Sequence, residues 1–167
     1  MADRKLRRFV ASELRRLGLS APFTRQHVCD AIARDRGRRL YLHPLPDDLG
    51  PDRPTGLWIA TDRADHIMVD PATSRPHQDL IIYHEIGHII LHDNLLAELP
   101  AAETSPDVDQ IADVVRQVQA RAGYTRTEEH EAETVARLIW SKATRLRWAP
   151  LHTCHPDLGR ALGVDHD

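Results

Sequence analysis

The sequence predicts a single α+β domain in which a small sheet of about three strands packs against helices. The chain has 167 residues, enough for one sizeable hydrophobic core. Apolar residues recur at helical spacing in both the N-terminal and C-terminal parts, and three short runs rich in apolar and β-branched residues lie between them. The turn between the last two runs is short, so we expect a three-stranded antiparallel sheet.

The first 37 residues predict two helices. Residues 3–17 place apolar side chains at helical spacing between Arg and Lys residues, and Gly18 is a suitable end. Thr24 can cap a second helix that ends at Gly37. The turn between the helices is long and contains a proline, which favours a packed pair of helices over a DNA-binding helix-turn-helix.

Residues 38–70 predict the sheet. Its first strand, "RRLYLHPL", is closed by Pro44 and Pro46, and a loop rich in Pro, Gly and Asp follows. The strands "LWIAT" and "HIMVD" come next, joined by the turn-like "DRAD".

Residues 77–145 predict a helical part and residues 146–167 an irregular tail, all within one domain over residues 1–167. The expected helices are an apolar one that follows the loop "PATSRPHQD" and ends near Asp93–Asn94, one over residues 107–122, and one from Glu128 to about Arg145 capped by Thr127.

Composition and charge exclude several classes of protein. The formal net charge of −3 gives no electrostatic reason to expect nucleic acid, and the basic N-terminal residues read as the polar face of an amphipathic helix. Two distant cysteines, Cys29 and Cys154, form no disulfide framework. No apolar run approaches the roughly 18 residues of a membrane span. We therefore expect a cytoplasmic protein without a membrane partner.

The stretch "HEIGHIILH" indicates a metal site. His84 and His88 are four residues apart, so a helix directs both imidazoles at one point, where they can bind one Zn²⁺. Glu85 lies about 100° round the helix, where it can act as general base on a water activated by the metal. The surrounding apolar residues predict a buried helix, in which unpartnered polar groups would be costly. Gly87 lowers helix propensity by about 1 kcal/mol relative to Ala, which indicates that another backbone passes close by.

The third ligand is expected in "TRTEEHEAETVARLIW". Glu129 and Glu133 are one helical turn apart and flank its apolar face, whereas Glu128 and Glu131 lie nearer the solvent side. Acidic residues also suit the first turn of a helix because of its dipole. The residue pattern alone leaves the choice of ligand open.

The two motifs together resemble the ImmA/IrrE family of zinc metallopeptidases. "HEIGHIILH" followed about forty residues later by "EHEAETVA" is similar to that family's HEIGH helix and its E-x-E-A-N-x-F-A-like helix. The resemblance covers about residues 54–140 and implies Glu129 as the third zinc ligand, with Glu131 on the second Glu of the pattern. Glu133 stands where the family has Asn, so it could orient a ligand histidine or replace Glu129 as ligand.

This resemblance implies a thermolysin-like minimal peptidase with one zinc ion per chain. Such proteins often cleave, or help to inactivate, a helix-turn-helix repressor and so derepress genes. An exposed strand beside the motif helix could hold an extended peptide by strand addition. The alternative is a non-catalytic, zinc-stabilised module that binds a regulator or forms one half of a toxin–antitoxin-like pair. A zinc hydrolase acting on something other than peptide is a third possibility.

Several other polar residues are candidates for supporting roles. His92 continues the i, i+4 series, but a helix turns past the metal by that point, so a supporting or surface role is expected. The cluster His152, Cys154 and His155 is expected to be incidental. The candidates for stabilising a negatively charged transition state are Tyr83, Tyr124, His66 and His130, with Tyr83 pointing away from the histidine face.

Overall fold

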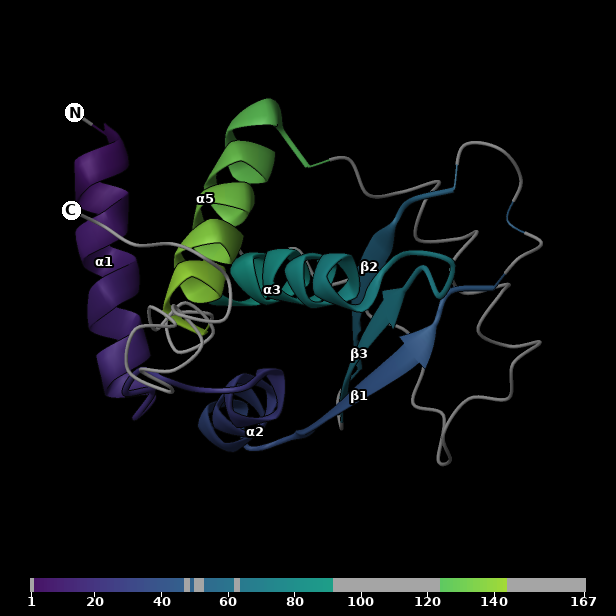
Figure 1. The fold of residues 1–167 in the computed structure, drawn as a ribbon, viewed down its shortest axis with the longest axis horizontal. Helices are drawn as coiled ribbons and strands as arrows, with labels where there is room; N and C mark the ends of the chain where they lie inside the picture. The colour runs from purple at the N-terminus through teal and green to yellow at the C-terminus, as the bar shows by residue number, and fades with distance from the viewer. Residues whose placement is uncertain (1, 47–48, 50–52, 62–63, 92–123, 144–167) are drawn as a thin grey trace, which may run out of the picture.

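A computed structural model of the chain describes residues 2–46, 49, 53–61, 64–91 and 124–143 (Figure 1). The elements are α1 (Ala2–Arg16), α2 (Arg25–Arg36), β1 (Arg39–Pro44), β2 (Gly56–Ala60), β3 (Ala64–Val69), α3 (Arg75–Leu91) and α5 (Arg126–Ala143). The α+β prediction is confirmed. The expected helix over residues 107–122, the tail over 146–167 and the residues His92, His152, Cys154 and His155 lie outside the described residues.

The sheet is mixed, so the prediction of an antiparallel sheet is wrong. Its strand order is β1-β3-β2. β2 and β3 are antiparallel, as their short connection predicts, but β1 pairs parallel to β3 from Arg39 opposite Ala64 to Pro44 opposite Val69. The chain between β1 and β2 is too long to act as a tight hairpin turn, so it does not force the two strands to pair, and contacts from distant parts of the chain decide the place of β1.

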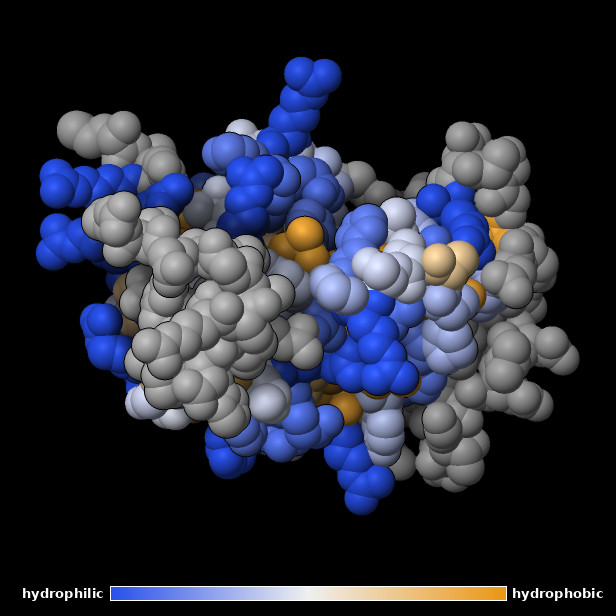
Figure 2. Space-filling model, in the orientation of Figure 1, coloured by the Kyte–Doolittle hydropathy of each residue, from blue (hydrophilic) through white to orange (hydrophobic). Residues whose placement is uncertain are grey.

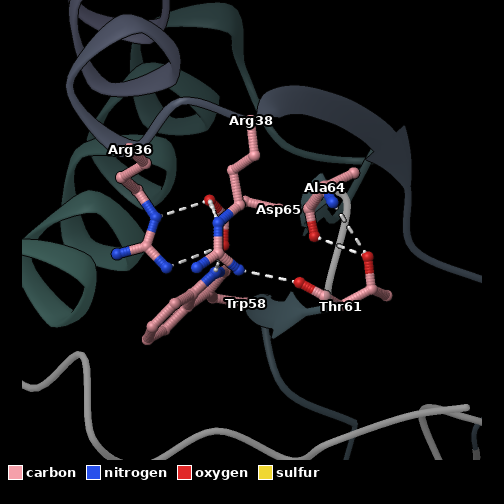
Figure 3. Close-up of polar contacts among 6 residues, drawn as sticks. All are labelled: Arg36, Arg38, Trp58, Thr61, Ala64 and Asp65. Carbon is pink, nitrogen blue, oxygen red and sulfur yellow. Dashed lines mark hydrogen bonds and ion pairs between the residues drawn. The ribbon is translucent and has the colours of Figure 1, made fainter. Parts of the chain in front are cut away.

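A buried carboxylate supplies one such contact (Figure 3). Asp65 on β3 is 0% exposed and accepts hydrogen bonds from Arg36 Nε at 2.6 Å and from Trp58 Nε1 at 3.0 Å. Arg38, two residues further on, donates to the Thr61 carbonyl oxygen at 2.7 Å. A buried charge left without a partner is strongly destabilising, so these bonds attach the end of α2 and the start of β1 to β3.

The ends of α1 and α2 follow local rules. Gly18 and Gly37 have φ of 73° and 65°, the left-handed conformation that ends a helix. The amide of His27 donates to Thr24 Oγ1, and His27 Nδ1 accepts from the Thr24 amide. The predicted cap and both predicted ends are confirmed.

The starts of α3 and α5 differ from the predictions. α3 begins at Arg75, inside the segment predicted as a loop; the proline that follows is compatible with the first turn of a helix. For α5, the predicted cap Thr127 is wrong. Thr125 caps this helix, because its Oγ1 accepts from the Glu128 amide while Glu128 Oε2 accepts from the Thr125 amide at 2.7 Å.

α3 lies at the centre of the described fold. It contacts β2 and β3 on one side and α5 on the other, while α1 packs on α5 and α2 on β1. Their apolar residues form one core cluster. On the face shown in Figure 2, hydrophobic atoms appear only as small spots among hydrophilic residues. Among the described helices, none combines the length and apolar character needed to cross a bilayer.

Candidate metal centre

The two histidines of α3 converge as the i, i+4 spacing predicts. His84 Nε2 and His88 Nε2 are 3.1 Å apart, and the ring planes are inclined by 79°. His88 is 1% exposed, whereas His84 keeps 25% of its side chain exposed. The pair therefore has one ligand inside the core and one at the surface of a cavity.

Glu129 on α5 completes a group of three. Its Oε2 is 3.2 Å from His84 Nε2 and its Oε1 is 3.8 Å from His88 Nε2. Two ligands of a tetrahedral zinc ion, each about 2.0–2.1 Å from the metal, are separated by about 3.3 Å. The three side chains fit this spacing, and their ligand atoms all lie within 4.8 Å of one another. This group can hold a metal ion.

A close approach of two backbones positions the group. A Cβ added at Gly87 would lie 2.9 Å from the carbonyl oxygen of Ala132 and 3.0 Å from its Cα. The prediction that another backbone passes Gly87 is confirmed, and that backbone belongs to α5. Because Ala132 follows Glu129 by less than one turn, this contact sets the distance from Glu129 to the histidines.

The carboxyl group of Glu85 is buried. It is 6% exposed, and burial, together with the nearby charge of Glu129, raises its pKa to about 8. A hydrogen bond from the Trp58 backbone partly opposes this shift. The space beside Glu85 depends on Gly56, where an added Cβ would lie 2.8 Å from Glu85 Oε1. Sequence reasoning missed this role of Gly56, since a glycine at the start of a strand gives no signal of a contact with α3.

A cavity of about 660 Å³ opens onto the group. Side chains of α3, including His84 and Glu85, line one part of the cavity, and side chains of α5, including Glu129, line another. Tyr124 also lines the cavity, and its ring stacks on His88 with centroids 3.7 Å apart and planes inclined by 14°. The buried carboxyl of Glu85, two members of the group of three and an aromatic side chain thus share one accessible space.

The other acidic candidates lie outside the group. Among the described residues, neither Glu131 nor Glu133 belongs to the set that could hold a metal. Glu133 is half-exposed and forms an ion pair with Arg137 one turn further along α5. The geometry thus favours Glu129, the ligand that the family resemblance implies.

Of the four candidates for transition-state stabilisation, two line the cavity and two do not. Tyr83 is 1% exposed and does not line the cavity. His66 lies on the sheet, where its Nδ1 is 3.0 Å from His43 Nε2. His130 and Tyr124 line the cavity.

A scan of the chain against protein-family models finds no match, and a search among curated proteins finds no significant relative. The likeness to the ImmA/IrrE family therefore stays a prediction carried by the two motifs.

Proposed function

We propose that this protein is a cytoplasmic zinc metallopeptidase of thermolysin-like architecture. The observation that supports this most is the buried carboxyl of Glu85 in a cavity that two residues of a three-residue metal group, His84 and Glu129, also line. A structural zinc site is normally closed by four protein ligands and needs no base, whereas a hydrolytic site has three ligands and a position for water. His84, His88 and Glu129 would hold the ion.

Glu85 is the general base of the proposed reaction. When bound, Zn²⁺ would supply an activated water and polarise the scissile carbonyl. A nearby cation favours the ionised form of Glu85, which can then accept a proton from the attacking water. As the carbon–nitrogen bond breaks, Glu85 returns this proton to the leaving amine nitrogen.

The substrate class we propose is a protein segment in extended conformation. β2 is an edge strand of the described sheet, and the backbone of its Trp58 reaches Glu85. A peptide added beside β2 would lie next to the base and the metal group. The resemblance suggests a helix-turn-helix regulator as the natural substrate.

Metal content and cleavage of a candidate regulator test this function together. The wild-type protein should bind about one Zn²⁺ per chain and cleave, while Glu85→Gln should bind zinc and fold normally but lose cleavage. Glu13→Gln, the same change on α1, is the matched control and should cleave normally. Undiminished cleavage by Glu85→Gln would remove the general-base role. Zinc binding with no cleavage of any regulator tested would favour the non-catalytic module.

A further inference from the structure

The residues assigned so far leave one requirement of peptide hydrolysis without a group. When water adds to the scissile carbonyl, the electron pair of the C=O bond moves to oxygen and creates a negative charge. Active sites lower the energy of this state with a hydrogen-bond donor placed where the charge develops. The donor must be a polar group of the cavity that lies beside the metal ligands.

Tyr124 occupies such a place. Its ring covers the face of His88, with 3.7 Å between ring centroids. Glu85 and Glu129 line the same cavity as Tyr124. The tyrosine thus contacts one proposed ligand and shares the cavity with the proposed base and the third ligand.

The start of α5 holds Tyr124 in position. The residue directly precedes Thr125, whose backbone and hydroxyl both bond to Glu128 in the capping box. A residue next to a capped helix end has little freedom, and the stack on the buried His88 restricts it further. The stack therefore orients the aromatic ring, and the capping box fixes the backbone that directly follows it.

The other candidates are less well placed. Tyr83 and His66 do not line the cavity. His130 lines it from an exposed position on α5, whereas Tyr124 contacts a ligand histidine directly.

We propose that Tyr124 is a catalytic residue whose hydroxyl donates a hydrogen bond to the carbonyl oxygen of the scissile peptide as negative charge develops there. The proton stays on the tyrosine, and the bond is released when the carbonyl re-forms and the amine leaves. This assignment rests on the proposed peptidase function. A tyrosine hydroxyl, with an ordinary pKa of about 10, is protonated at neutral pH and able to donate.

Two zinc-binding probes separate the hydroxyl from the ring. An N-phosphoryl dipeptide carries charged oxygens that mimic the tetrahedral state, whereas a mercaptoacetyl dipeptide binds zinc through sulfur and offers no such oxygen. Tyr124→Phe should keep zinc affinity and thiol-probe affinity but lose more than about tenfold in affinity for the phosphoryl probe. Its kcat should fall by about 10²–10³-fold with little change in KM.

Two further variants complete the experiment. Tyr124→Ala also removes the stack, so it should weaken zinc binding in addition. Tyr41→Phe on β1, where the lost hydroxyl accepts only a bond from Arg39 among the described contacts, is the matched control and should behave like wild type.

The remaining results would overturn either the role of the hydroxyl or the peptidase function. Unchanged affinity of Tyr124→Phe for the phosphoryl probe would overturn the role of the hydroxyl. An equal loss for both probes, or a loss of zinc, would mean that the side chain only positions His88, which also overturns it. A wild-type protein that binds neither zinc nor the probes would overturn the proposed peptidase function itself.

Discussion

Two pairs of histidines in this molecule have almost the same spacing and different chemistry. On α3, the Nε2 atoms of His84 and His88 are 3.1 Å apart, their rings are inclined by 79°, and Glu129 lies within 3.2 Å. On the sheet, His43 Nε2 and His66 Nδ1 are 3.0 Å apart, but their rings are within 23° of parallel.

The surroundings decide what each pair can hold. Among the described residues no carboxylate pairs with His43 or His66, and Asp65 next to His66 is bound to Arg36 and Trp58. Burial lowers the pKa of both sheet histidines, so the two rings stay neutral and can share an N–H···N hydrogen bond. A short nitrogen–nitrogen distance alone therefore does not identify a metal site; the convergent carboxylate and the open cavity do.

The largest expected effect is the loss of zinc affinity when the carboxylate of Glu129 is removed. Zinc binding to small structural sites amounts to about 12 kcal/mol, so removing one of three ligands should cost roughly 4 kcal/mol, or on the order of 10³-fold in affinity. Glu129→Ala should show this loss by competition with a chelator, while Glu131→Ala and Glu133→Ala should bind nearly as well as wild type. His43→Ala should leave zinc affinity unchanged; a loss equal to that of Glu129→Ala would end the distinction between the two pairs.

The next effect is the pH dependence of the metal-free protein. The pKa of Glu85 is about 8 in the fold against 4.5 for an ordinary glutamate, so the folded state holds a proton that the unfolded chain releases. This contribution to stability is fully present below pH 4.5 and is lost as the pH rises to about 8. Chemical denaturation across this pH range should show the free energy of unfolding falling by about 3 kcal/mol. The shift in the pKa of Glu85 sets an upper limit of about 5 kcal/mol on this loss.

Glu85→Gln supplies the control for this measurement, because a neutral amide cannot titrate. Its stability should change much less between pH 4.5 and 8. An equal slope in wild type and variant would show that other groups cause the effect.

A third effect concerns the contact of the two helices. Gly87→Ala should lower the free energy of unfolding by about 2 kcal/mol, because the added Cβ meets the backbone of Ala132 and the helices must separate. Zinc affinity should fall with it. Gly37→Ala is a useful control. The positive φ of Gly37 strains an alanine by about 1 kcal/mol. Gly37 lies on neither of the two helices that carry the metal group, so zinc affinity should stay the same. Unchanged zinc affinity in Gly87→Ala would show that the ligands do not depend on this contact.

The smallest effect is expected at the histidine pair on the sheet, His43 and His66. Its dependence on pH has the opposite sign to that of Glu85. Because the pKa of His43 and of His66 lies below 6.5, their contribution to stability is present above pH 6.5 and is lost as the pH falls below it. His43→Gln should reduce stability at pH 7.5 by about 1 kcal/mol, the value of one hydrogen bond, and make the acid side of the profile flatter. His77→Gln, at an exposed position, should leave the profile unchanged. An acid slope of His43→Gln as steep as that of wild type would contradict the shared bond.

The comparison also separates what the sequence could predict from what it could not. His84, Glu85 and His88 follow from helical periodicity, and Gly87 marks the approach of another backbone; both rules act over a few residues. The choice of Glu129 needed the resemblance in addition to periodicity, because several glutamates lie within one turn.

Features that depend on distant residues were not predictable. The parallel pairing of β1 depends on Arg36 reaching Asp65, 29 residues along the chain. The stack of Tyr124 on His88 likewise depends on two residues that lie far apart in the sequence. The capping box of α5 was available in the sequence as Thr125 followed three residues later by Glu128, and choosing Thr127 overlooked it.

The contact between Gly87 and Ala132 also has a consequence for ion selectivity. It joins main chain to main chain, so no change of rotamer can widen it, and the two helices present a group of two imidazoles and one carboxylate to an ion. Calcium needs six to eight oxygen ligands at 2.3–2.6 Å, and magnesium prefers an octahedron of oxygens. A group of two imidazoles and one carboxylate suits neither, so it would discriminate against these two cations by ligand type.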